Sequence, residues 1–127
     1  FSAPTATMPA ARRIYSRFPI PMPRLCANLT FLWNELDFMD RFAAAAKAGF
    51  RGVEYLFPYE FPAAQILERL RKHRLEQVLF DLPAGDWAKG DRGNAIFPDR
   101  VGEFQDGVGK ALDYAKELGC KRLTVLE

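Results

Sequence analysis

A long and chemically varied segment, DLPAGDWAKGDRG, occupies residues 81–93 of the 127-residue chain. It contains a tryptophan, three glycines, three aspartates and two basic residues, and it follows no helical or strand period. A connection between a strand and a helix usually takes only about two to six residues. So long a connection, rich in aromatic and charged groups, is typical of a functional loop.

Two other segments, residues 28–35 and 54–59, have a similar mixture of side chains, and each comes at the end of an apolar run. In a parallel barrel the loops after the strands meet at one face, so residues of successive loops come together there. Aromatic, amide and carboxylate groups suit a pocket for a small polar substrate. The alternative is that Trp33 and Trp87 only cover this end of the sheet and that the charges are solvated. The residues expected there from the first two loops are Asn28, Trp33, Asn34, Glu35, Glu54, Tyr55, Phe57, Pro58 and Tyr59.

Strand-like and helix-like patterns alternate from residue 24 onward. Asp37 and Asp99 are predicted N-caps, while Gly49 and Gly119 are predicted to end their helices. The predicted strands are 24–29, 52–57, 76–82 and 121–127, and the predicted helices are 36–50, 62–73 and 99–118. The helical residues predicted to face the core are Phe38, Phe42, Ala45, Ala46, Ile66, Leu67, Leu70, Val101, Phe104, Val108, Ala111, Leu112, Ala115 and Leu118.

This alternation predicts an α/β fold built from parallel β/α units with right-handed crossovers. The first loop, NLTFLWNE, lacks the glycine-rich phosphate fingerprint of a dinucleotide-binding fold. A TIM barrel needs eight units and about 250 residues, whereas four units are present here. The chain is therefore expected to form either an open four-stranded domain or about half of a TIM barrel.

Charge is unevenly distributed along the chain. The net charge is +2, but residues 1–24 hold four arginines and no acid. Residues 25–127 carry 14 basic and 16 acidic side chains, a net charge of −2. A slightly acidic folded part argues against a nucleic-acid-binding surface, and no apolar run approaches the roughly 18 residues of a membrane span.

Residues 1–21 are rich in Pro, Ala, Ser and Arg. We expect a leader or disordered arm there, with a mitochondrial transit peptide as the alternative, and a folded domain over residues 22–127. Cys26 and Cys120 lie in apolar strand-like segments and are predicted to be buried free thiols. They have no zinc-like ligand spacing.

Four segments of the chain carry a family resemblance. They are MPRLCANLTFLWNE, AAAAKAGFRGVEYLFPYEFPA, LEQVLFDLPAGDWAKGDRG and FQDGVGKALDYAKELGCKRL. Together they resemble the N-terminal half of the hydroxypyruvate isomerases, which are xylose-isomerase-like TIM barrels. VEYLFPY and LPAGDWAKGDRG are the most specific parts, and the related 2-oxo-tetronate isomerases share much of the pattern.

The resemblance implies that the complete protein converts hydroxypyruvate to 2-hydroxy-3-oxopropanoate. In such barrels a divalent metal, Mg²⁺ or Mn²⁺, polarises the substrate, and a carboxylate moves a proton between adjacent carbons. The family's metal and acid–base carboxylates lie on later strands. The resemblance therefore assigns no catalytic and no metal-binding residue to this chain.

The chain is still expected to bind the substrate. Arg92 and Lys89 are candidates to meet the substrate carboxylate, and Trp87 is a candidate to close over the pocket. Glu54 and Asn28 complete the predicted substrate-binding set, with a structural hydrogen bond as the alternative role of Glu54. Gly85, Gly90 and Gly93 would give this loop the freedom of a lid, and Asp86 would brace it.

The expected partner is therefore a small anionic hydroxy-oxo acid, with neither nucleic acid nor membrane. We expect a cytoplasmic protein, or a mitochondrial one if residues 1–21 are a transit segment. Abasic-site endonucleases share this barrel superfamily, but their histidine-rich metal cluster is not matched by a chain whose single histidine is His73. A non-catalytic half-barrel, or a homo-oligomer joined through exposed sheet edges, is the other alternative.

Overall fold

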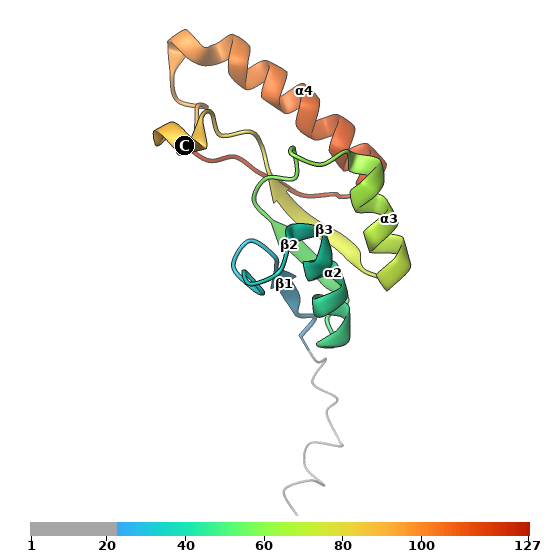
Figure 1. The fold of residues 1–127 in the computed structure, drawn as a ribbon. Helices are drawn as coiled ribbons and strands as arrows, with labels where there is room; N and C mark the ends of the chain where they lie inside the picture. The colour runs from blue at the N-terminus through green and yellow to red at the C-terminus, as the bar shows by residue number, and fades with distance from the viewer. Residues whose placement is uncertain (1–22) are drawn as a thin grey trace, which may run out of the picture.

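The computed structural model describes residues 23–127, so the predicted leader at 1–21 lies outside the described residues. Strands and helices alternate as the sequence pattern predicted (Figure 1). Two short 3₁₀ turns, η1 and η2, precede the last helix. The elements are β1 (Cys26–Asn28), α2 (Phe38–Lys47), β2 (Gly52–Tyr55), α3 (Ala63–His73), β3 (Glu76–Asp81), η1 (Trp87–Lys89), η2 (Pro98–Arg100), α4 (Val101–Leu118) and β4 (Leu123–Thr124).

The four strands form one parallel sheet in the order β1-β2-β3-β4. The helices follow one another along the same side of this sheet, with α3 packed between α2 and α4 (Figure 1). A doubly wound sheet reverses its strand order and carries helices on both faces. The consecutive order and the single helical layer are instead those of a TIM-barrel wall.

The core lies between the sheet and the helices. β1 and β2 contribute Ala27, Val53 and Tyr55, while Phe42 and Ile66 come from α2 and α3. The predicted inner faces of the first two helices are thus confirmed.

On α4 the buried residues are Ala111, Ala115 and Leu118, whereas Val101 and Leu112 are about half exposed. Leu112 is one residue, or about 100° of helical rotation, away from Ala111, and Val101 lies in the first turn at the far end of α4.

The predicted helix caps are only partly correct. Asp37 occupies the N-cap position of α2, but its side chain makes no capping hydrogen bond. Asp99 lies inside η2, and Arg100 takes the N-cap position of α4. Gly49 and Gly119 do end α2 and α4, both with positive φ.

The last strand is much shorter than the predicted 121–127, because only Leu123 and Thr124 pair with β3.

Both cysteines are free, as predicted, although Cys26 is only half-buried while Cys120 is buried. No helix in the described part of the chain combines the length and apolarity needed to cross a membrane.

Candidate active site at the carboxyl edge of the sheet

Four polar residues lie near the carboxyl ends of the four strands, in two pairs. Asn28 of β1 pairs in register with Glu54 of β2, and Asp81 of β3 pairs with Thr124 of β4. Side chains alternate between the two faces of a strand. Ala27, the residue before Asn28, is part of the core under the helices, so Asn28 faces the opposite side, which would be the interior of a barrel.

Hydrogen bonds fix the orientation of Asn28. Its Oδ1 accepts the backbone N–H of Thr30 at 3.0 Å, so its Nδ2 is free to donate to Glu54 Oε1 at 3.1 Å. The backbone of β1 is tied to the same place, because Leu29 N–H donates to the Glu54 carbonyl at 2.8 Å. The predicted residues Asn28 and Glu54 are therefore brought together, and Glu54 Oε2 makes no hydrogen bond within residues 23–127.

A β-bulge places Asp81 in this row. Val53 pairs with Gln77 but Glu54 pairs with Leu79, so Val78 is an extra residue in β3. The extra residue reverses the alternation beyond it. Phe80 consequently enters the core and Asp81 turns to the face that carries Glu54.

The environment of Asp81 favours its protonated form. Burial raises the pKa of this carboxyl group, and the negative charge of Glu54 adds to the rise, while a hydrogen bond from Thr124 opposes it. The Tyr59 hydroxyl donates to the Asp81 carbonyl at 2.6 Å and so holds the end of β3. The sequence pattern assigned no role to Asp81 or Thr124. The available signal was a charged residue directly after the apolar residues Val78, Leu79 and Phe80.

The long loop brings Trp87 and Arg92 together against the loop that follows β2. The Trp87 ring packs at an angle on Phe57, with 5.0 Å between ring centroids. The Arg92 guanidinium carbon lies 4.0 Å from the Trp87 ring centroid, a cation–π contact. Arg92 Nη1 donates to the carbonyls of Trp87 and Asp91 at 3.1 and 2.7 Å. No carboxylate among residues 23–127 pairs with Arg92, so its charge remains available to an anion.

Lys89 is placed differently from Arg92. Its Nζ forms an exposed ion pair with Asp86 Oδ2 at 2.8 Å, so its charge is already compensated. Asp86 Oδ1 also accepts the backbone N–H of Lys89 at 3.2 Å. Asp86 therefore braces the η1 turn, as expected from the sequence.

Two of the three loop glycines lie where a side chain would not fit. Gly85, Gly90 and Gly93 all have positive φ. A Cβ at Gly85 would overlap the Asp91 carboxylate, and one at Gly93 would overlap the backbone of Leu126. The structure thus accounts for two of these glycines without invoking movement, and closure of the loop as a lid stays a prediction.

Two residues expected at the carboxyl edge lie elsewhere. Trp33 has a φ of 58° and packs edge-on against Phe50, which shortly precedes β2, with 6.2 Å between centroids. Tyr55 is buried under the helices against Phe38 and Phe42, because its place in the strand alternation directs it into the core. None of these aromatic contacts involves Asn28, Glu54 or Asp81.

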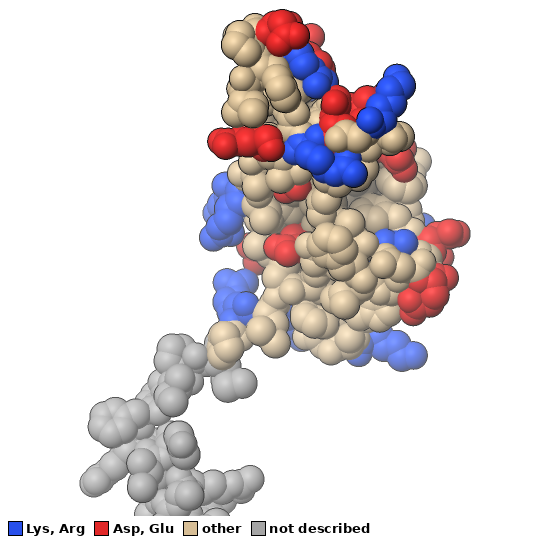
Figure 2. Space-filling view, turned by 90° about the vertical axis from the view of Figure 1, so that its left-hand side faces the viewer, with Lys and Arg blue, Asp and Glu red and all other residues tan. Residues whose placement is uncertain are grey.

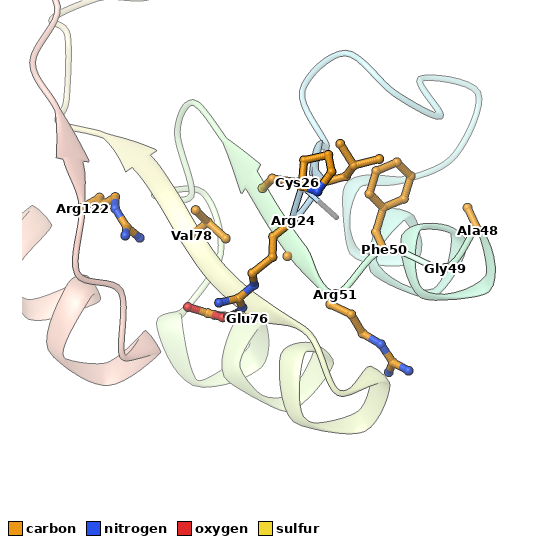
Figure 3. Close-up of a pocket in the computed structure, with 12 residues that line it drawn as sticks. Arg24, Cys26, Ala48, Gly49, Phe50, Arg51, Glu76, Val78 and Arg122 are labelled. Carbon is orange, nitrogen blue, oxygen red and sulfur yellow. Dashed lines mark hydrogen bonds and ion pairs between the residues drawn. The ribbon is translucent and has the colours of Figure 1, made fainter. Parts of the chain in front are cut away.

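A cavity lies at the opposite, amino edge of the sheet. It measures about 550 Å³, and the ion pair between Arg24 and Glu76, at 2.9 Å, lies along its wall (Figure 3). Burial, Glu54 and Glu76 raise the pKa of the Cys26 thiol in this cavity to about 11, so it is not a thiolate nucleophile. Active sites of TIM barrels form at the carboxyl edge, so this cavity is not the candidate site.

Within residues 23–127, no three His, Cys, Asp or Glu side chains come together as a metal ligand set. Glu54 and Asp81 lie on the same face of the sheet, but a third protein ligand is missing from their surroundings. No metal position is therefore assigned to the residues that the structure describes.

Residues 42–127 match the family described as "Xylose isomerase-like TIM barrel". The chain belongs to this family, as its sequence resemblance predicted, and the parallel strand order agrees with it.

Particular relatives extend this assignment. The chain is 50% identical over 105 residues to the 2-oxo-tetronate isomerase of Cupriavidus necator, a match covering 83% of this chain and 40% of that protein. It is 49% identical over 105 residues to the hydroxypyruvate isomerase of Escherichia coli, covering 83% and 41%. A crystal structure described as an AP endonuclease, family 2, from Brucella melitensis superposes with a TM-score of 0.79 and 53% identity, covering 80% of this chain and 40% of that one. The chain thus spans about 40% of the length of these relatives.

Proposed function

We propose that the complete protein is an isomerase of small hydroxy-oxo acids that interconverts hydroxypyruvate and 2-hydroxy-3-oxopropanoate. The observation that carries this proposal is the identity of about 50% to relatives named hydroxypyruvate isomerase and 2-oxo-tetronate isomerase. Both names specify a 2-oxo acid whose carboxylate is ionised at neutral pH. In this proposal residues 22–127 form the substrate-binding part of the barrel.

Arg92 is the residue we propose to bind the substrate carboxylate. Its cation is held on Trp87 without an ion-pair partner among the described residues. A guanidinium that binds a carboxylate inside a closed site forms a strong charge-assisted hydrogen bond. Lys89, whose charge is balanced by Asp86, is the weaker of the two candidates.

Asn28 and Glu54 are proposed to orient the rest of the substrate. Glu54 is fixed by Asn28 through one oxygen, so its other oxygen can accept a hydrogen bond from a substrate hydroxyl. Trp87 would exclude water above this site, together with Phe57. These contacts hold a small acid in one orientation, which the transfer of a proton between adjacent carbons requires.

The proton transfer itself is proposed to depend on residues outside this chain. A divalent metal, Mg²⁺ or Mn²⁺, would polarise the substrate carbonyl when bound. The described residues supply no three-ligand set for this metal. We further propose that the complete protein is cytoplasmic.

The experiment is a comparison of substrates with the complete protein and a divalent metal. Hydroxypyruvate should be converted to 2-hydroxy-3-oxopropanoate with a higher kcat/KM than 2-oxo-tetronate. A preference for 2-oxo-tetronate would move the assignment to the related isomerases, to which this chain is equally similar. No turnover of either acid would refute the proposal.

DNA cleavage is the alternative activity, because the similar Brucella melitensis structure is described as an AP endonuclease. The charge distribution does not favour it. Basic and acidic side chains lie next to each other on the face seen in Figure 2, without a continuous basic surface. Incubation of the complete protein with an abasic duplex should therefore leave the DNA intact.

A further inference from the structure

Arg100 joins the long loop to the last helix. From the junction of η2 and α4, its Nη2 contacts Asp91 Oδ2 in the loop at 2.8 Å and Glu103 Oε1 in α4 at 2.7 Å. Its Nε also donates to Glu103 Oε2 at 2.8 Å. The side chains of Arg100 and Asp91 are only about one quarter and one third exposed. By contrast, the Lys116–Asp113 pair on the same helix is about four-fifths exposed, at 4.0 Å.

Further contacts fold the loop around this guanidinium. Asp91 Oδ2 accepts the backbone N–H of Asp86 at 2.7 Å. Buried Asn94 donates from Nδ2 to Glu103 Oε1 at 3.1 Å. The space beside Asp91 and Arg100 admits only glycine at position 85. We call Asp91, Asn94, Arg100 and Glu103 the Arg100 cluster.

The cluster is directly connected to the proposed substrate-binding pair. Asp91 is the neighbour of Arg92 in sequence, and its carbonyl accepts from Arg92 Nη1 at 2.7 Å. The same Nη1 also donates to the Trp87 carbonyl, so the Arg92 side chain links the two ends of residues 87–92. The backbone N–H of Trp87 donates to the Gly85 carbonyl at 3.1 Å. Displacement of Asp91 would therefore displace both Arg92 and Trp87.

We infer that Arg100 is a positioning residue for substrate binding, which holds the loop so that Trp87 and Arg92 are already in place when the acid arrives. This role rests on the proposed function. Arg100 does not itself contact the substrate. A loop that is ordered before the substrate binds loses less conformational entropy on binding. The ordering therefore increases the affinity for the substrate. The guanidinium also lowers the pKa values of Asp91 and Glu103, so both carboxylates stay ionised to a lower pH than unpaired side chains would.

The test uses the complete protein and the variants R100A, R100K and D91N. K116A is the matched control, because it removes an ion pair from the same helix without touching the loop. Hydrogen exchange of peptides covering residues 85–97 measures the order of the loop, and peptides from α2 and β2 report global folding. Kinetics with hydroxypyruvate give KM and kcat separately.

R100A and D91N should speed exchange in residues 85–97 only, and should raise KM about tenfold with kcat changed less than about twofold. R100K should lie between R100A and the parent, because an ammonium can keep one ion pair but cannot reproduce the two-nitrogen contact with Glu103. K116A should match the parent in both measurements.

The two proposals fail in different ways. If the parent protein does not isomerise these acids, the proposed function fails, and the exchange measurement still tests the cluster. Unchanged exchange at residues 85–97 in R100A would overturn the role of Arg100 whatever the activity. Faster exchange with unchanged KM, or with a loss confined to kcat, would overturn its role in substrate binding.

Discussion

At the scale of single residues, the neighbouring cations Arg92 and Lys89 differ in whether a carboxylate already pairs with them. Among residues 23–127, Arg92 lies on Trp87 and donates to backbone carbonyls alone, whereas Lys89 pairs with Asp86. An anion that binds Lys89 must compete with Asp86, and an anion that binds Arg92 meets no such competitor among these described residues. The pairing of Lys89 follows from the three-residue spacing in DWAK, which the 3₁₀ turn η1 brings into contact.

Replacement of Arg92 by alanine in the complete protein should lower kcat/KM for hydroxypyruvate by roughly tenfold or more, since a charge-assisted hydrogen bond to the substrate is lost. Lys89→Ala is the matched control and should change kcat/KM by less than about twofold, as expected for an exposed ion pair. Steady-state kinetics with the two variants measures both effects. Equal losses in R92A and K89A would contradict the assignment of Arg92.

We expect Asp81 to make the stability of the protein depend on pH. Its pKa is raised in the folded state, so the folded protein holds this proton more tightly than the unfolded chain does. The stabilising contribution is complete at low pH and is lost as the pH rises above about 4, through the raised pKa. Asp81→Asn, which imitates the protonated group, should therefore raise the free energy of unfolding at pH 7 but not at pH 3.

Urea unfolding of the parent and D81N proteins at several pH values measures this difference. Asp106→Asn is a suitable control, because Asp106 is an exposed residue of α4. An advantage of D81N that stays constant from pH 3 to pH 7 would show that burial does not perturb the Asp81 carboxyl group.

At the scale of elements, the hydrophobic period predicted the strands and helices because each has one face buried in the core. The residue types preferred at helix ends predicted the helix caps less well. Asp37 and Asp99 have the residue type of N-caps, but neither side chain caps a helix, and the η2 turn places Arg100 at the start of α4. The Arg100 cluster was not predicted either, because it depends on how a 16-residue connection, 82–97, folds back on α4.

The bulge in β3 shows why the site could be predicted only in part. A strand without the bulge would direct Asp81 toward the helices, since Gln77 at the same parity is buried there. The insertion of Val78 reverses this direction and creates the row with Glu54. No residue type in EQVLFD marks the bulge, because it is fixed by pairing with β2 and not by local preference. Asn28 and Glu54 belong to the pairing of β1 with β2, which has no bulge, and the sequence placed both residues at this edge.

Two glycines of the long loop separate the effect of backbone conformation from that of packing. Gly85 and Gly90 both have positive φ, but only Gly85 has no room for a Cβ. Gly90→Ala should cost about 1 kcal/mol through backbone strain alone. Gly85→Ala should cost roughly 1–3 kcal/mol more, because it also displaces Asp91 from Arg100. Urea unfolding of both variants measures this difference, and equal losses would show that the loop shifts without resistance.

At the scale of the whole molecule, the described sheet has two edges. β1 pairs only with β2, and β4 pairs only with β3. A TIM barrel removes such edges by closing eight strands into a ring. Since the chain spans about 40% of its relatives' length, the remaining strands must come from elsewhere for the ring to close.

The purified 127-residue chain should therefore show no metal-dependent turnover of hydroxypyruvate. The row of Asn28, Glu54 and Asp81 lies on the face that would line the interior of a complete barrel, and residues 23–127 contain no three-ligand metal cluster. Supplying the remainder of the barrel as a second polypeptide, taken from the Escherichia coli relative, should restore activity if the exposed edges of β1 and β4 pair with it. The complete relative is the positive control, and light scattering of the chain alone shows whether the edges instead pair two copies. Turnover by the chain alone within about tenfold of that control, and abolished by a chelator, would show that catalytic carboxylates such as Glu54 and Asp81 suffice without the other half.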